Sequence, residues 1–148
     1  GNVHTRLRKL EEENFDGIIL AAAGLKRLGL LEQDTYEYTF LAPEEFIPAG
    51  GQGLMAVEAK AGTAAHSLAQ AMDHAQGRLC LDLERSVLKQ LDAGCHEPIG
   101  IYSVLQNGQL EVWGISSLRG EVKRIHLTGG TSRRDIEKLA SEAWKGLM

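Results

Sequence analysis

A lone cysteine stands at the bend of residues 91–100 (LDAGCHEPIG), where it could act as a nucleophile. The helical pattern before it ends at Gly94, and Pro98 begins an extended run. A loop fixed at both ends by rigid elements exposes a sulfur for chemistry, whereas a helix interior buries it as a small apolar group. The position by itself fits both a reactive Cys95 and a half-buried structural cysteine.

Arg6 is a second residue whose placement suggests chemistry. Asn2 is a good N-cap, and Val3, Leu7 and Leu10 then fall on one helical face, so Arg6 lies in the first turn of an expected helix. A cation there opposes the helix dipole. It is explained if an anion binds both the guanidinium and the free backbone N–H groups, and the alternative is a solvated surface arginine.

The segment after this helix predicts an α/β layer. Residues 15–20 form a continuous apolar run, which is typical of a buried strand, and residues 21–28 predict a short helix. Ligands of open α/β sheets bind beyond the carboxyl ends of the strands. Small side chains at that end, beginning with Ala21, allow a planar ligand to approach the backbone.

Residues 49–53 predict a flexible loop, because three of the five are glycine. No lysine or serine follows in the spacing of a phosphate-binding loop, so a plain hinge is the alternative. Residues 54–59 then predict a mostly buried strand. An unpaired apolar strand favours aggregation or swapping, so we expect residues 1–60 to be loosely ordered or to pair with another copy.

The remainder predicts a small α+β domain. Helices are expected from Thr63 to residue 76, with a break at Gly77, and over residues 79–91, where Cys80 lies on the apolar face as a core cysteine. Strands are expected at 99–106, 110–116 and 121–127, because Asn-Gly at 107–108 is a strong hairpin signal. Ser132 and Asp135 resemble a capping box before a C-terminal helix. We therefore predict two domains, 1–61 and 62–148, with a hinge at 60–62.

Composition excludes several functional classes. The net charge of −4 and the pI near 5.7 argue against a nucleic-acid partner. No apolar run approaches the roughly 20 residues of a membrane span, and the start shows no signal-peptide pattern. Two cysteines in such a chain indicate thiols in a reducing cytoplasm. His66 and His74 are eight residues apart, which does not fit a helical metal pair, so no metal is expected.

Four stretches in succession resemble the porphobilinogen deaminase (hydroxymethylbilane synthase) family. They are residues 1–10 (GNVHTRLRKL), 16–29 (DGIILAAAGLKRLG), 48–53 (PAGGQG) and 91–100. The first is similar to the family's RGNVxTRL segment without its leading arginine, and the third to its PAVGQG loop. Gly50 stands where valine is usual and Ala93 where glycine is usual. After residue 100 the similarity is one of pattern only.

The resemblance implies a fold and an activity. The fold is the second half of a periplasmic-binding-protein-like α/β domain, followed by a small α+β domain with a three-stranded antiparallel sheet. The activity is that of a transferase in tetrapyrrole and heme biosynthesis, which joins four porphobilinogen units to hydroxymethylbilane with loss of ammonia. Because only the C-terminal half is matched, we expect the chain to be inactive without the N-terminal half. The full enzyme is expected to be a monomer, and the fragment alone to self-associate.

The resemblance also implies site residues. Cys95 aligns with the cysteine that carries the dipyrromethane cofactor through a thioether, and a thiolate suits this as a soft nucleophile. Arg6 and Arg27 align with arginines that bind carboxylates of the cofactor and of the growing pyrrole chain. Ala21 and Gln52 are expected to border the cleft. The catalytic aspartate belongs to the half that this chain does not match, so no catalytic residue is expected here.

Two other functions compete with an enzyme part. One is a non-catalytic module that binds linear tetrapyrroles or other polycarboxylates through Arg6 and Arg27, with Cys95 as the anchor. The other is a Cys–His acyl-transfer enzyme that uses Cys95. His96 is the neighbouring residue, and adjacent side chains rarely point at one another, so the acyl-transfer hypothesis ranks last.

Overall fold

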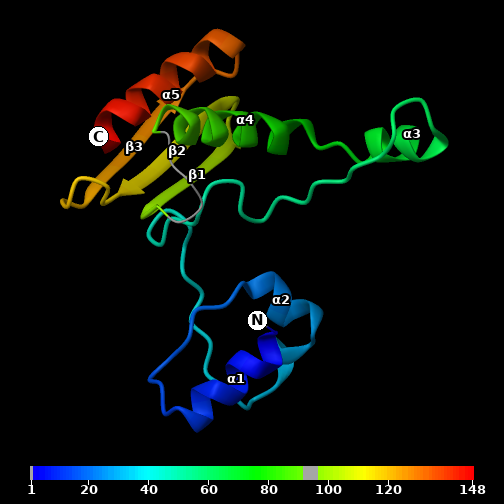
Figure 1. Ribbon diagram of the computed structural model, residues 1–148, viewed down its shortest axis with the longest axis vertical. Helices are drawn as coiled ribbons and strands as arrows, with labels where there is room; N and C mark the ends of the chain where they lie inside the picture. The colour runs from blue at the N-terminus through cyan, green and yellow to red at the C-terminus, as the bar shows by residue number, and fades with distance from the viewer. Residues whose placement is uncertain (1, 92–96) are drawn as a thin grey trace. The chain divides into compact units, whose positions relative to one another are not determined.

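The structure is a computed structural model that describes residues 2–91 and 97–148 (Figure 1). The chain divides into two compact units, Gly1–Leu41 and Ala42–Met148, and each is described by itself. The boundary between the two units, after Leu41, thus comes before the hinge expected at residues 60–62. The domain boundary at that hinge stays a prediction.

The first unit is built from helices. It contains α1 (Val3–Glu12), α2 (Ala22–Arg27) and the short 3-10 helix η1 (Leu30–Glu32). Asn2 caps α1 as expected, because its side-chain oxygen accepts the N–H of His4 at 2.9 Å. A small core joins the three helices through three buried leucines, Leu7, Leu25 and Leu30.

The prediction of a strand at residues 15–20 was wrong, because the structure has no strand among the described residues of this unit. Ile18 and Leu20 pack on the leucine core, but Phe15 is 50% exposed and Ile19 63% exposed. A strand requires hydrogen-bonded neighbours, and this unit supplies none. The α/β layer expected here is therefore not found within the described part of Gly1–Leu41.

The second unit contains the expected three-stranded antiparallel sheet. Strands β1 (Ile99–Gln106), β2 (Gln109–Ser116) and β3 (Lys123–Gly129) lie in the order β1-β2-β3. The turn between β1 and β2 has positive φ at both Asn107 (52°) and Gly108 (78°), as a type I′ turn requires. The hairpin prediction is therefore confirmed.

Helices α4 (Ala75–Gln90) and α5 (Arg133–Leu147) cover one face of this sheet (Figure 1). Between helices and sheet lies the main core, to which all the buried residues of α5 belong. The buried members of the core are Leu83, Val87, Leu91, Ile101, Leu110, Val112, Ile136, Leu139, Ala140, Ala143 and Leu147.

The start of α5 is a capping box, as the sequence predicted. The N–H of Asp135 donates to Ser132 Oγ at 3.2 Å, and the N–H of Ser132 donates to Asp135 Oδ2 at 3.3 Å. The hydrogen bond from the Ser132 hydroxyl holds the pKa of the Asp135 carboxyl below its ordinary value. The ionised carboxylate therefore stabilises the folded state.

This cap predicts a pH dependence of stability. Because the pKa of Asp135 is lower in the folded than in the unfolded chain, its contribution is complete above about pH 4 and is lost as the pH falls through the folded-state pKa. We expect Asp135→Asn to destabilise the chain at pH 6 and to have almost no effect near pH 2. Urea unfolding at both pH values measures this. In the Ser132→Ala variant, the difference in the free energy of unfolding between pH 6 and pH 2 should be smaller than in the unaltered chain. An unchanged difference would contradict the assignment.

The helix break expected at Gly77 was wrong. Helix α3 (Ala64–Ala71), capped by Thr63 as expected, ends earlier, and Gly77 lies in the first turn of α4. The cause is His74, whose Nδ1 accepts the N–H of Gly77 at 3.0 Å and so caps α4. A side-chain cap that starts a new helix outweighs the low helix propensity of one glycine.

The strand expected at residues 54–59 is also absent, and the expectation that it is mostly buried was wrong. No described residue there is in a strand, and Leu54, Met55 and Val57 are 43%, 85% and 55% exposed. We expect the amides of residues 54–59 to exchange rapidly in monomeric chain and to become protected when copies associate. Hydrogen exchange at two protein concentrations measures this, and protection in the monomer would contradict it.

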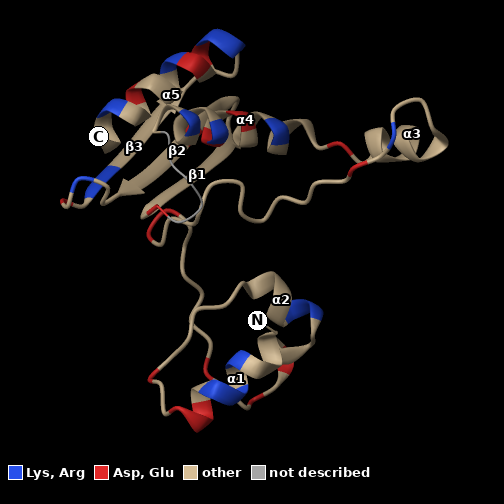
Figure 2. Cartoon of the chain, in the orientation of Figure 1, with Lys and Arg blue, Asp and Glu red and all other residues tan. Residues whose placement is uncertain are grey.

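Charged side chains of both signs are interspersed along α5 (Figure 2). They form exposed pairs one helical turn apart, Arg133–Glu137 at 3.1 Å and Lys138–Glu142 at 3.9 Å. Such pairs contribute little to stability but make this surface well solvated. Among the described helices, none has the length and apolar character needed to cross a membrane.

Candidate functional site

Arg6 lies in the first turn of α1, as expected, with its side chain exposed. The other two cations of this helix are neutralised one turn later: Arg8 pairs with Glu12 at 3.7 Å and Lys9 with Glu13 at 2.8 Å. Within residues 2–91 and 97–148, Arg6 forms no such pair. Its guanidinium is therefore available to an anion, in the position where the sequence suggested one.

Arg27 and Ala21 stand at the two ends of α2. Ala21 is the residue before the helix and makes no side-chain cap, and Arg27 is the last helical residue. Both are exposed. Because Leu25 of α2 and Leu7 of α1 share one core, the two predicted arginines are carried by helices of the same unit.

Gln52 lies in the glycine-rich turn of the second unit, with its side chain exposed. Its N–H donates to the carbonyl of Ala49 at 3.2 Å. Gly50, where the family has valine, is close to α4: a Cβ on it would lie 2.7 Å from Leu88 Cδ1. Leu88 thus occupies the volume that a larger side chain at position 50 would need.

Cys95 lies outside the residues that the structure describes. Its flanking elements are described: α4 ends at Gln90 and β1 begins at Ile99. The other cysteine, Cys80, packs against the main core, and burial raises the pKa of its thiol, opposed in part by a hydrogen bond with Ser103. The prediction that Cys80 is a core cysteine is confirmed, and a raised pKa makes it a poor nucleophile.

Sequence reasoning placed Glu84 on the apolar face of its helix but gave no role in the site to this residue, which is only 5% exposed. Its Oε1 accepts the N–H and the hydroxyl of Ser103, both at 2.8 Å, and its Oε2 accepts the N–H of Gly51 at 2.6 Å. A signal was present, because Glu84 shares a helical face with Val87 and Leu91. A carboxylate among apolar positions requires donors from elsewhere in the fold.

The turn and the buried carboxylate together cover the free edge of β1. The N–H of Ile101 donates to the carbonyl of Pro48 at 2.9 Å, while that of Ser103 donates to Glu84. Gly100 permits this approach, since a Cβ there would lie 2.5 Å from the carbonyl oxygen of Ile47. An exposed strand edge is thereby closed, and the turn that carries Gln52 is fixed against β1.

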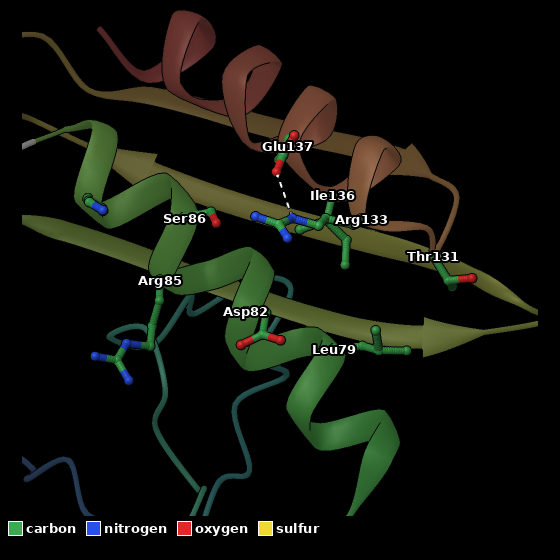
Figure 3. A pocket seen from close by; sticks show the side chains of 9 residues that line it. Leu79, Asp82, Arg85, Ser86, Thr131, Arg133, Ile136 and Glu137 are labelled. Carbon is green, nitrogen blue, oxygen red and sulfur yellow. Dashed lines mark hydrogen bonds and ion pairs between the residues drawn. The ribbon is translucent and has the colours of Figure 1, made fainter.

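A groove of about 770 Å³ lies between α4 and α5 (Figure 3). Its charged lining mixes signs, with three cations and two acids, and Arg133 already pairs with Glu137 at 3.1 Å. Of the residues predicted for cofactor binding, those that the structure describes (Arg6, Ala21, Arg27 and Gln52) do not line it. The lining residues are Leu79, Asp82, Arg85, Ser86, Lys89, Thr131, Arg133, Ile136 and Glu137.

Two protein-family models match successive segments of the chain. Residues 1–67 match the model described as "Porphobilinogen deaminase, dipyromethane cofactor binding domain", and residues 78–143 match "Porphobilinogen deaminase, C-terminal domain". The chain belongs to the porphobilinogen deaminase family. The resemblance inferred from four short motifs is confirmed.

Named porphobilinogen deaminases are similar over most of the chain. That of Clostridium acetobutylicum is 42% identical over 129 residues, which are 87% of this chain and 43% of the relative. That of Chromobacterium violaceum is 46% identical over 116 residues, 78% of this chain and 37% of the relative. The chain thus spans less than half the length of these porphobilinogen deaminases, and corresponds to a C-terminal part.

The two family domains divide the predicted site residues. The cofactor-binding domain of the porphobilinogen deaminase family covers Arg6, Ala21, Arg27 and Gln52, while the C-terminal domain covers Cys95. Their individual roles stay predictions.

Proposed function

We propose that this chain acts as the C-terminal part of a porphobilinogen deaminase, the transferase that joins four porphobilinogen units to hydroxymethylbilane with release of ammonia. The observation that carries the proposal is the match of two domains of this family in succession, over residues 1–67 and 78–143. The place of action is the cytoplasm, where both cysteines stay reduced.

The residues of this chain suit a polycarboxylate cofactor. Cys95 bonds to the dipyrromethane through its sulfur, and Arg6 and Arg27 bind carboxylates through charge-assisted hydrogen bonds. The absence of an ion pair at Arg6, in the described part of the chain, supports this role. Ala21 and Gln52 are each proposed as further contacts of the cofactor. When bound, the dipyrromethane supplies the pyrrole to which the first porphobilinogen is joined.

The partner of this chain is the remaining part of the enzyme. In this pairing, residues 1–61 contribute to an α/β domain of the periplasmic-binding-protein kind. Their exposed apolar side chains, including Phe15, Ile19 and Met55, support this pairing, because burial of such surface stabilises an interface. The resemblance to the family implies that the acid assisting ammonia release belongs to the part that this chain does not match, so we expect turnover to need the partner.

Complementation tests this function. The chain is produced together with the part of the Clostridium acetobutylicum relative that it does not match, and porphobilinogen consumption is measured. Turnover by the pair and none by either piece is the expected result. A folded, associated pair without turnover would contradict the proposal, and tetrapyrrole binding by this chain alone would favour a non-catalytic module.

Arginine variants of the paired enzyme test the carboxylate contacts. We expect Arg6→Gln and Arg27→Gln each to lower kcat/KM for porphobilinogen about tenfold or more, since each removes a charge-assisted hydrogen bond. Arg8→Gln is the matched control, because Arg8 already pairs with Glu12 and should lose little. Equal effects at all three positions would indicate loss of net charge rather than specific contacts.

A further inference from the structure

The two edges of the sheet differ. The edge at β1 is closed, because the outward N–H groups of Ile101 and Ser103 both donate to acceptors outside the sheet. Strand β3 forms the other edge (Figure 1). Within the part of the chain that the structure describes, no segment pairs with β3 on the side away from β2. An uncovered strand edge can pair with a further strand.

The register of the sheet identifies the unpaired backbone groups of β3. Because Ile101 and Ser103 direct their N–H groups away from β2, the even-numbered residues of β1 bond to β2. Alternation along antiparallel strands then makes the odd-numbered residues of β3 bond to β2. The N–H and C=O groups of Arg124, His126 and Thr128 therefore point outward, and no backbone hydrogen bond from the described chain reaches them.

The same three residues are exposed and place their side chains on the sheet face opposite the helices. The ring of His126 stacks on that of Trp113, with centroids 4.4 Å apart and planes 9° apart, and Trp113 lies next to Tyr102 of β1. An aromatic row thus crosses the sheet and ends at β3. The other face of the His126 imidazole is directed past the free edge, where a further ring can stack.

We propose that β3 is a self-association surface, on which a second copy of this chain pairs its own β3 in antiparallel orientation about His126. Two-fold symmetry then places His126 opposite His126 and Arg124 opposite Thr128 of the other copy. Each of these pairs exchanges both backbone hydrogen bonds, and the aromatic row continues from one copy into the other.

The charges along β3 favour a second copy as the occupant. In this register Arg124 faces the uncharged Thr128, so no like charges oppose one another. Thr128 is also the cross-strand neighbour of Glu111, which brings the arginine of one copy close to a carboxylate of the other on the same sheet face. This surface is separate from residues 1–60, where the sequence predicted pairing between copies.

Amide exchange at two protein concentrations tests the pairing. We expect the outward amides of Arg124, His126 and Thr128 to exchange rapidly at about 10 µM, and about fivefold more slowly at about 1 mM, since a small interface binds weakly. The amides of Ile125 and Leu127, which bond to β2, should be equally protected at both concentrations.

Two results of this measurement would overturn the inference. Protection of the outward amides that is independent of concentration would mean that another segment of the same chain covers β3. Rapid exchange at both concentrations would mean that no second copy pairs there, and protection that arises only after addition of the remainder of the enzyme would assign the edge to that partner instead.

Charge variants test the register, with the dissociation constant of the dimer measured by sedimentation equilibrium. Thr128→Lys places a lysine opposite Arg124 of the other copy at two symmetric positions, so we expect the constant to rise about tenfold. Combining Arg124→Glu with Thr128→Lys opposes unlike charges and should return the constant to within about twofold of the unaltered chain. All substituted side chains are exposed, so the monomer should stay folded.

Arg124→Glu alone is the matched control, because it removes the hydrogen bond from Arg124 Nη2 to the carbonyl of Glu45 without opposing like charges. It should change the dissociation constant less than Thr128→Lys does. A loss of pairing in Thr128→Lys that the double variant does not reverse would overturn the proposed register. Both tests use the chain alone, so neither result affects the complementation test of the proposed function.

Discussion

Cys95→Ser should abolish both cofactor attachment and turnover in the paired enzyme. A serine hydroxyl stays protonated at neutral pH, whereas a thiol is partly ionised and its sulfur is a soft nucleophile toward an electrophilic carbon. We expect turnover to fall on the order of 10³-fold or more, because the residue that anchors the cofactor cannot be replaced by binding contacts. Intact mass and porphobilinogen consumption measure the two effects separately.

Cys80→Ala is the matched control for this variant. Cys80 packs against the main core with a thiol whose pKa is raised by burial, so it should neither carry a cofactor nor affect turnover. We expect the variant to melt at a somewhat lower temperature and to keep the cofactor on Cys95. A dipyrromethane adduct on Cys80, or normal turnover in Cys95→Ser, would contradict the assignment of the anchor.

Short sequence patterns correctly predicted the elements that are determined by residues close together in the sequence. The β1–β2 turn follows from Asn-Gly, which tolerates positive φ at both positions. The start of α5 follows from Ser132 and Asp135, which satisfy each other's backbone groups. The three-stranded sheet then needs only alternation along adjacent segments, and it formed as expected.

The failure at residues 15–20 has its cause elsewhere in the fold, whereas the failure at Gly77 comes from a side chain three residues away. An apolar run such as residues 15–20 indicates a tendency to be buried, but a strand exists only where a neighbour offers its hydrogen bonds. Gly77 was expected to break a helix because its propensity is low, yet the imidazole of His74 caps a new helix there.

The candidate site also combines features that short motifs predict with contacts between distant residues that they do not predict. Motifs supplied Arg6, Arg27, Gln52 and Cys95, but they did not show that the turn packs against α4 and β1. The Glu84–Gly51 hydrogen bond joins residues 33 positions apart, so no window of sequence contains it. The signal that the local sequence offers for this hydrogen bond is a carboxylate on an otherwise apolar, buried face of a helix.

The core between α4 and the sheet predicts the largest loss of stability. Leu83 has no exposed surface and lies in the main core. Leu83→Ala removes buried methyl groups and leaves a cavity, so we expect it to cost about 3 kcal/mol. For a unit of this size the melting temperature should fall by more than about 10 °C.

Leu68→Ala on α3 is the matched control, because Leu68 is 70% exposed and the same atoms are removed there from water. We expect a change within about 0.5 kcal/mol, measured by urea unfolding of both variants. Similar losses would contradict the packing of α4 on the sheet. Since α4 ends at Gln90, five residues before Cys95 in the sequence, Leu83→Ala should also slow cofactor attachment at temperatures where the second unit begins to unfold, but not well below them. Slow attachment at low temperature would mean that Leu83 affects attachment at Cys95 without unfolding of the core.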